Sequence, residues 1–104
     1  MTRGDVHAVT PPRGRGRLQH GPRYAVIVQA SDLTPLSTVV GCPTSRSARI
    51  TRFRPEIELL DQRTRVLCEQ VGALDVAWIG ERVDHLSLDE QLAVDEALRL
   101  VLDL

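Results

Sequence analysis

The sequence predicts a small, mostly β protein with one helix at its C-terminal end. Short apolar runs rich in β-branched residues alternate with Gly- and Pro-containing turns, and one long amphipathic segment follows them. The 104 residues are enough for one small domain, 1–104, and not for two. This pattern favours a compact, mostly antiparallel barrel with helical additions.

The first strands are predicted from two apolar runs on either side of a turn-rich loop. Residues 5–9 form a short strand, and residues 23–29 have the continuous apolar centre of a strand that is buried on both faces. Residues 10–22 contain too many Pro, Gly and Arg residues for regular structure. Residues 30–36 connect to the next strand, and Pro35 prevents a helix there.

The middle of the chain is predicted to complete the sheet with shorter elements separated by polar turns. The strands are expected at 37–43, 53–59 and 65–68, a basic loop at 47–52, a candidate extension of the sheet at 72–74, a candidate helical turn at 76–81, and either a strand or a loop at 82–86.

The clearest predicted element is a C-terminal helix that begins after Ser87. Ser87 and Glu90 have the spacing of a capping box, in which each side chain accepts a hydrogen bond from the other residue's backbone N–H. Leu92 and Leu100 lie off the apolar face, and they belong either to a dimer interface or to a wider core face. The core-facing stripe at helical spacing consists of Val94, Ala97, Leu98, Val101 and Leu102.

The composition favours a folded protein without a membrane segment. Hydrophobic residues make up 42% of the chain, and no apolar run approaches the roughly 20 residues that cross a bilayer. The N-terminus lacks the features of a signal peptide, so we expect a cytoplasmic protein. Cys42 and Cys68 are expected to be buried thiols, and His7, His20 and His85 lack the spacing of a zinc site.

Charge is divided unequally between the two halves of the chain. Residues 1–55 contain nine Arg and two Asp, a net charge of +7, whereas residues 56–104 contain four Arg and twelve acidic residues, a net charge of −8. The chain has no Lys, so the use of Arg alone indicates little. The clustering favours a phosphate-facing surface made by the first half over a chance distribution.

Several motifs follow one another in an order that resembles a known toxin family. They are Arg-Gly-Asp-Val at 3–6, an Arg-led apolar strand at 23–29, a second apolar strand that leads to Thr44, an E-x-E strand at 54–59 and Glu-Gln-Val at 69–71. In this order they resemble the MazF/PemK toxins along nearly the whole chain. The sequence departs from the family at Tyr24, where Pro is usual, and at Gly72, where a basic residue is usual.

The resemblance implies a fold, an activity and partners. The fold is the small Src-homology-3-like barrel of the plasmid-maintenance toxins, the CcdB/MazF type. The activity is that of an mRNA interferase: a sequence-specific, metal-independent endoribonuclease without cofactors. It cleaves single-stranded RNA by 2′-hydroxyl attack, leaves a 2′,3′-cyclic phosphate and a 5′-hydroxyl, and so inhibits translation and growth. The implied partners are a second copy in a homodimer and a cognate antitoxin with an acidic, disordered tail.

The resemblance makes Arg23 and Thr44 the catalytic pair. A guanidinium suits this role because its planar fork donates to two phosphate oxygens at once, and the Thr44 hydroxyl can donate to the same phosphate. Because the pKa of Arg lies above about 12, Arg is a poor general base. We therefore expect Arg23 to act first through transition-state electrostatics, with proton transfer as a secondary role.

The expected RNA-binding residues combine arginines that hold phosphates with polar residues that read bases. A carboxylate such as Glu69 accepts hydrogen bonds from exocyclic amines, and an amide such as Gln70 pairs with adenine. Tyr24, Phe53 and Trp78 are expected in the core rather than under stacked bases. The full set is Arg13, Arg15, Arg17, Gln29, Ser45, Arg46, Arg49, Arg52, Glu69 and Gln70.

Two alternatives remain beside the endoribonuclease interpretation. A CcdB-like toxin shares the barrel fold but binds DNA gyrase and cuts nothing. Such a toxin acts through an aromatic residue on its last helix, and the segment 102–104 of this chain contains none. A catalytically dead RNA-binding barrel is the other alternative: Arg23 and Thr44 disfavour it, whereas Tyr24 and Gly72 leave it open.

Overall fold

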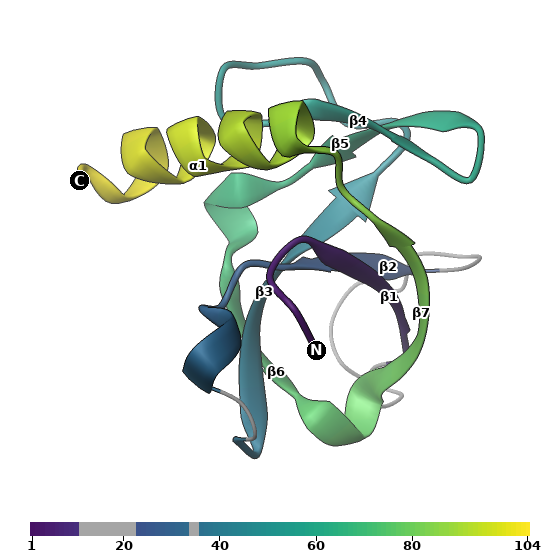
Figure 1. The fold of residues 1–104 in the computed structure, drawn as a ribbon. Coiled ribbons are helices and arrows are strands. Elements are labelled where there is room, and N and C mark those ends of the chain that lie inside the picture. Colours follow the sequence, from purple (N-terminus) through teal and green to yellow (C-terminus); the bar gives the residue numbers. More distant parts are fainter. Residues whose placement is uncertain (11–22, 34–35) are drawn as a thin grey trace.

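The computed structural model describes residues 1–10, 23–33 and 36–104, in which a strongly curled sheet is covered by one α-helix (Figure 1). The strands are β1 (Asp5–Val9), β2 (Tyr24–Ile27), β3 (Thr38–Ser45), β4 (Glu56–Leu59), β5 (Gln62–Val66), β6 (Gly72–Asp75) and β7 (Ile79–His85). The helical elements are α1 (Leu88–Leu102) and the single 3-10 turns η1 (Ser31–Leu33), η2 (Cys68–Gln70) and η3 (Val76–Trp78).

The strand order explains the curl of the sheet. The strands lie in the order β4-β5-β3-β2-β1-β7, each antiparallel to its neighbour, and β6 also pairs with β3. One edge of β3 pairs with β2, while its other edge pairs with β6 along residues 38–41 and with β5 along residues 44–45. The predicted mostly β fold, a half-barrel with one C-terminal helix, is confirmed.

Tertiary pairing moves several strand ends away from the predicted positions. The first strand is confirmed at its predicted ends, but β3 continues past Pro43 because Thr44 and Ser45 pair with β5. β4 begins at Glu56 rather than at residue 53, since the backbone N–H of Arg54 bonds back to the carbonyl oxygen of Thr51 at 3.2 Å in a turn. In the segment 82–86, which was open between strand and loop, residues 82–85 belong to β7, which pairs with β1.

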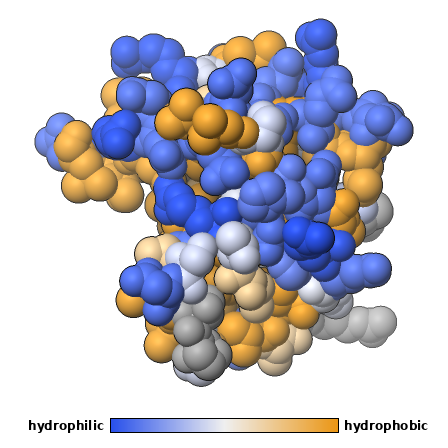
Figure 2. Space-filling model, viewed as in Figure 1, coloured by the Kyte–Doolittle hydropathy of each residue, from blue (hydrophilic) through white to orange (hydrophobic). Residues whose placement is uncertain are grey.

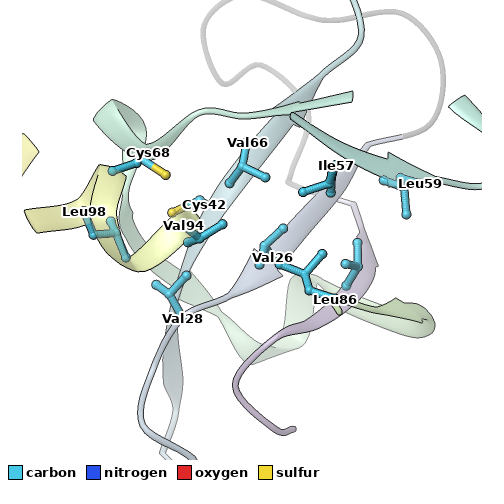
Figure 3. Packing of buried hydrophobic residues seen from close by; sticks show 12 residues of the cluster. Val26, Val28, Cys42, Ile57, Leu59, Val66, Cys68, Leu86, Val94 and Leu98 are labelled. Atoms are coloured by element: carbon cyan, nitrogen blue, oxygen red, sulfur yellow. The ribbon is translucent and has the colours of Figure 1, made fainter. Parts of the chain in front are cut away.

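The hydrophobic core lies between the sheet and α1. Val26 of β2 and Cys42 of β3 are opposite one another in the ladder and are at most 1% exposed. Side chains of α1 and of the β4–β5 hairpin close over them, as Figure 3 shows. Burial of such aliphatic side chains provides the main favourable term for folding. The residues that α1 contributes are Val94, Ala97 and Leu98. Val101 is partly buried and packs against this cluster.

The predicted capping box of α1 is present. The Ser87 hydroxyl accepts from the Glu90 N–H at 3.2 Å, and Glu90 Oε1 accepts from the Ser87 N–H at 2.9 Å. The second carboxylate oxygen of Glu90 accepts from the backbone N–H of Glu58 at 2.9 Å, which fastens the helix start to β4. Arg3 ties the helix to the N-terminal strand, because its guanidinium donates to Asp95 and to the Val28 carbonyl.

Several leucines on the outer side of α1 are exposed to solvent. Leu92 is 53% exposed and Leu100 is 45% exposed, so the interpretation that they widen the core is wrong. Leu102, which was predicted to face the core, is 49% exposed. Figure 2 shows hydrophobic residues at the C-terminal end of α1 beside a mostly hydrophilic surface. No helix within the described residues is both long and apolar enough to cross a membrane.

Candidate active site

A cavity of about 550 Å³ lies on the face of the sheet opposite the core. Three of the residues that the sequence singled out line it: Arg23 at the start of β2, Thr44 near the end of β3, and Gln70 at the end of η2. The other lining residues are Val9, Tyr24, Ala25, Gly41, Pro43, Leu67, Gly72, Ala73, Leu74 and Trp78.

Arg23 reaches the cavity from the position directly before β2. Successive side chains of a strand point to opposite faces of the sheet. Val26 belongs to the core cluster, whereas Ala25 lines the cavity. Arg23 precedes Tyr24, the first residue of β2, and lines the same cavity. Its carbonyl oxygen accepts a hydrogen bond from the Val9 N–H at 3.0 Å, which holds its backbone beside β1.

The strand register brings Thr44 next to Arg23. Ala25 is opposite Pro43 in the antiparallel ladder, so the next pair outward is Tyr24 and Thr44. The Thr44 hydroxyl donates to the Tyr24 carbonyl oxygen at 3.2 Å. Thr44 is therefore held by the same backbone segment that carries the guanidinium. A hydroxyl and a guanidinium on neighbouring strands can donate to one phosphate group.

Gln70 reaches the cavity from a turn that is fastened to β3. The Leu67 N–H donates to the Pro43 carbonyl oxygen at 2.9 Å, and the Gln70 N–H donates to the Leu67 carbonyl oxygen at 2.9 Å. The turn is therefore anchored one residue before Thr44. Gln70 is exposed, and its amide can donate and accept at a base edge.

Beside these polar residues, much of the cavity wall is apolar, and at Gly41 neighbouring backbone lies close to the wall. A Cβ added to Gly41 would lie 3.0 Å from the Val26 carbonyl oxygen and 3.1 Å from Leu74 Cδ1, so a side chain there would require its neighbours to move. Trp78, in the turn before β7, and Tyr24 are both partly buried and both line the cavity. Aromatic rings in such a place can stack on unpaired bases.

The expectation for the aromatic residues was therefore incomplete. Tyr24 does pack against the core, but it also faces the cavity, as Trp78 does. The signal that could have placed Trp78 at the cavity is its position in a turn between two strands, which Asp75 caps. The Asp75 carboxylate accepts from the Ala77 N–H at 2.9 Å and fixes this turn.

The basic loop after β3 is ordered by hydrogen bonds to its own backbone. Ser45 Oγ accepts from the Ser47 and Ala48 N–H groups at 3.2 and 3.0 Å, so this hydroxyl caps a turn. Arg65 and Arg54 donate to the carbonyl oxygens of Arg46 and Arg49 at 3.2 and 3.3 Å. The loop therefore keeps its shape while exposing three of its own arginine side chains, those of Arg46, Arg49 and Arg52.

Besides Ser45, two more predicted RNA-binding residues have protein partners and do not line the cavity. Gln29 is 8% exposed: its Oε1 accepts from the Val40 N–H at 3.1 Å, and its Nε2 donates to the Leu33 carbonyl oxygen at 3.5 Å. The Glu69 carboxylate accepts two hydrogen bonds from Arg54. Arg13, Arg15, Arg17 and His20 lie outside the described residues.

The Glu69–Arg54 ion pair alters the acidity of both groups. Partial burial by itself raises the pKa of the Glu69 carboxyl, but the hydrogen bonds and charge of Arg54 outweigh burial and lower this pKa below its ordinary value. The hydrogen bond to Glu69 raises the pKa of Arg54. Both groups therefore stay charged at neutral pH.

The described histidines and cysteines lie away from the cavity wall. His7 Nδ1 is 2.9 Å from the Gly80 carbonyl oxygen, and His85 Nδ1 is 2.8 Å from Asp5 Oδ1. Cys42 and Cys68 are free and buried, as expected. Within the described part of the chain, no three His, Cys, Asp or Glu residues are grouped to hold a metal ion.

This site lies in a toxin fold. The chain belongs to the family of PemK-like, MazF-like toxins of type II toxin–antitoxin systems, whose sequence pattern matches residues 2–102. A protein of Mycobacterium tuberculosis proposed to be a toxin, Rv3098A, is 37% identical over 91 residues, which cover 86% of this chain and 85% of that protein.

Solved toxin structures share the fold. A mycobacterial endoribonuclease in complex with its cognate antitoxin superposes with a TM-score of 0.82 at 17% identity, over 100% of this chain and 96% of that chain. The Mycobacterium tuberculosis toxin MazF-mt6 gives 0.80 at 19% identity, over 96% and 97%. MazF from Deinococcus radiodurans gives 0.76 at 21% identity, over 100% and 97%.

Proposed function

We propose that this toxin is a sequence-specific endoribonuclease that cleaves single-stranded RNA at the cavity between β2, β3 and η2. The observation that carries the proposal is the meeting of Arg23, Thr44 and Gln70 at one cavity of a toxin-family fold. A guanidinium and a hydroxyl can donate to one phosphate, and an amide can read a base edge, so the three groups together suit selective RNA cleavage.

The proposed reaction uses the 2′-hydroxyl of the RNA as the nucleophile. Its oxygen forms a bond to the adjacent phosphorus, the bond from phosphorus to the 5′-oxygen breaks, and the products are a 2′,3′-cyclic phosphate and a 5′-hydroxyl. The proton of the 2′-hydroxyl is lost, and the leaving 5′-oxygen gains one. Because the nucleophile comes from the substrate, we propose that the reaction needs no metal ion.

Arg23 and Thr44 would act on the charge that develops on the phosphate. Donors that are already in place stabilise such charge without reorganisation at the moment of reaction. The guanidinium of Arg23 supplies a positive charge at the cavity, and the Thr44 hydroxyl would exchange its bond to the Tyr24 carbonyl oxygen for one to a phosphate oxygen. Both groups line one cavity, so they can act on the same phosphate.

The rest of the substrate would be held by the surroundings of the cavity. Exposed Arg46, Arg49 and Arg52 suit the RNA backbone, and Gln70 suits a base edge. We also assign Arg13, Arg15 and Arg17 to backbone binding on the strength of their charge. We propose that the substrate is messenger RNA in the cytoplasm and that cleavage inhibits translation and growth.

We propose two protein partners, a second copy of this chain and a cognate antitoxin. The exposed Leu92 and Leu100 of α1 are apolar surface that a homodimer could cover. The structures of MazE–MazF from Deinococcus radiodurans and of the mycobacterial complex pair a toxin of this fold with an antitoxin. The net charge of +7 in residues 1–55 would attract an acidic tail.

The test is cleavage of a long single-stranded RNA by the purified protein in excess EDTA. We expect discrete fragments from the wild type. Arg23→Ala should lower the rate about 10²–10³-fold, because a preorganised donor to the transition state is lost. Thr44→Val, which removes the hydroxyl at nearly constant shape, should lower it roughly 10- to 100-fold, and Thr44→Ser should keep most of the rate.

Arg63→Ala is the matched control for loss of an arginine. The Arg63 side chain is 78% exposed and lies 3.7 Å from Glu56 on the β4–β5 hairpin, so its removal should leave the rate unchanged. Cleavage that disappears in EDTA would overturn the metal-independent mechanism. Intact RNA with the wild type would overturn the endoribonuclease proposal and would lead to an assay of gyrase inhibition.

A further inference from the structure

We propose that the Arg54–Glu69 ion pair is a positioning device that holds the basic loop 46–52 in register with the cavity. This inference rests on the proposed function, because it assigns the pair a role in where RNA lies. It gives Glu69 a different task from direct base reading. Neither Arg54 nor Glu69 lines the cavity, so both would act through their neighbours.

The geometry of the pair is that of a strong, directed contact. Arg54 Nε and Nη2 donate to the same oxygen, Glu69 Oε2, at 2.9 and 2.6 Å. The Arg54 and Glu69 side chains are only 23% and 26% exposed, so solvent screens this pair less than it screens pairs on the open surface. Hydrogen bonds between ionised partners are shorter and stronger than neutral ones.

The same guanidinium also reaches the basic loop. Arg54 Nη1 donates to the Arg49 carbonyl oxygen at 3.3 Å, and Arg54 Cζ lies 5.5 Å from the centre of the Phe53 ring. One planar group therefore connects the middle of the loop with η2. A lysine at position 54 could not satisfy these two acceptors with the same geometry, because its ammonium lacks the rigid fork.

The other end of this connection leads to the cavity. Glu69 precedes Gln70, which lines the cavity, in the same turn. That turn is fastened to β3 through the Leu67 N–H and the Pro43 carbonyl oxygen, next to Thr44. The ion pair therefore links the loop that exposes arginines with the turn that carries the base-reading amide. A fixed distance between these two segments sets which nucleotide can lie over Thr44.

One feature of the pair is unexpected for a contact that serves stability alone. Glu69 Oε1 is buried and has no hydrogen-bond partner among the described residues. A buried carboxylate oxygen without a donor is unfavourable. The neighbouring ion pairs, Arg65 with Glu56 at 3.4 Å and Arg63 with Glu56 at 3.7 Å, use a more exposed carboxylate, 37% against 26%. The Arg54–Glu69 contact therefore holds its carboxylate in a more buried place than these pairs do.

The experiment measures KM and kcat for RNA cleavage with Arg54→Met, Glu69→Gln and the double variant. Each single change should raise KM about tenfold and change kcat less than about twofold, since the loop loses its register while Arg23 and Thr44 remain. The double variant should be no worse than the singles, because both changes remove the same contact. Cleavage by the wild type is established before the variants are compared. Failure of the proposed function is thereby distinguished from failure of the positioning role.

Two further readouts distinguish positioning from a simple loss of folding. The slope of log KM against log salt concentration should become shallower by about 0.7 or more in the variants, as one phosphate contact is lost. Arg54→Lys keeps the charge and should show an intermediate KM at an unchanged thermal midpoint. Arg63→Met is the matched control: it removes an exposed arginine that pairs with Glu56 at 3.7 Å on the β4–β5 hairpin, leaves the bond from Arg65 to the basic loop in place, and should leave KM unchanged.

Three outcomes would contradict the positioning role of the Arg54–Glu69 pair. If Glu69→Gln changes the cleaved sequence while Arg54→Met does not, Glu69 reads a base directly and the positioning role is wrong. If the losses in the two single variants add in the double variant, the two residues act independently. Equal KM values and salt slopes in the wild type and all variants would also overturn it.

Discussion

The Thr44 hydroxyl is directed by its 3.2 Å hydrogen bond to the Tyr24 carbonyl oxygen. This bond ties the hydroxyl to the strand that begins beside Arg23, so two residues 21 positions apart in the chain become neighbours. Gln70 joins them only through the turn that Leu67 anchors to β3. At this scale the site depends on backbone register, which decides which side chains can meet.

Gln70 offers the most selective test at the level of a residue. Gln70→Ala should relax the sequence preference of cleavage at one position, because the amide that reads the base edge is gone and the phosphate contacts are unaffected. The loss of a bidentate base contact corresponds to about 1–3 kcal/mol of discrimination. Sequencing of the cleaved ends over a randomised RNA pool measures it, and an unchanged preference would contradict the assignment.

At the scale of elements, the sequence predicted those features that depend on contacts between neighbouring residues. The capping box of α1 and the apolar run of β2 depend on neighbours within four residues, and both are present. The end of β3 depends on pairing with β5, further along the chain, which no local pattern contains. The start of β4 depends on the turn in which the Arg54 N–H bonds to the Thr51 carbonyl oxygen. Of the predicted site, the convergence of Arg23 and Thr44 followed from the family resemblance.

Contacts that form only in the folded chain account for the features of the site that the sequence did not show. Gln29 belongs to an apolar strand pattern and gave no sign that its amide bonds to the Val40 N–H. Glu69 sits fifteen residues from Arg54, and only the folded chain brings their charges together. Trp78 was assigned to the core because aromatic residues are usually buried, whereas the curl of the sheet leaves it at the cavity.

Removal of the helix cap tests the role of α1 as a cover over the core. Ser87→Ala should lower the free energy of unfolding by about 1 kcal/mol, because the Glu90 N–H loses its acceptor. Urea unfolding measures this change. The rate of RNA cleavage should stay the same, since α1 lies on the opposite face of the sheet from the cavity. Ser37→Ala, at an exposed position before β3, is the control, and an equal loss in both would contradict the prediction.

At the scale of the whole molecule, the two faces of the sheet have separate tasks. The face under α1 is filled with aliphatic side chains and provides stability. The opposite face carries the cavity, and the basic loop lies next to the turn that enters it. The acidic second half of the chain contributes α1, and under the proposed function the basic first half would attract an RNA.

The most direct test of the central claim uses an RNA oligonucleotide cut at its mapped site, beside the same oligonucleotide with a 2′-deoxy sugar on the nucleotide before the cut. If the 2′-hydroxyl is the nucleophile, the all-ribose strand is cleaved in EDTA to a 2′,3′-cyclic phosphate and a 5′-hydroxyl, and the substituted strand stays intact at that position while it still binds and competes. Cleavage of the 2′-deoxy strand at the same bond and a similar rate would show that water or a protein group attacks the phosphorus, and would contradict the proposed mechanism.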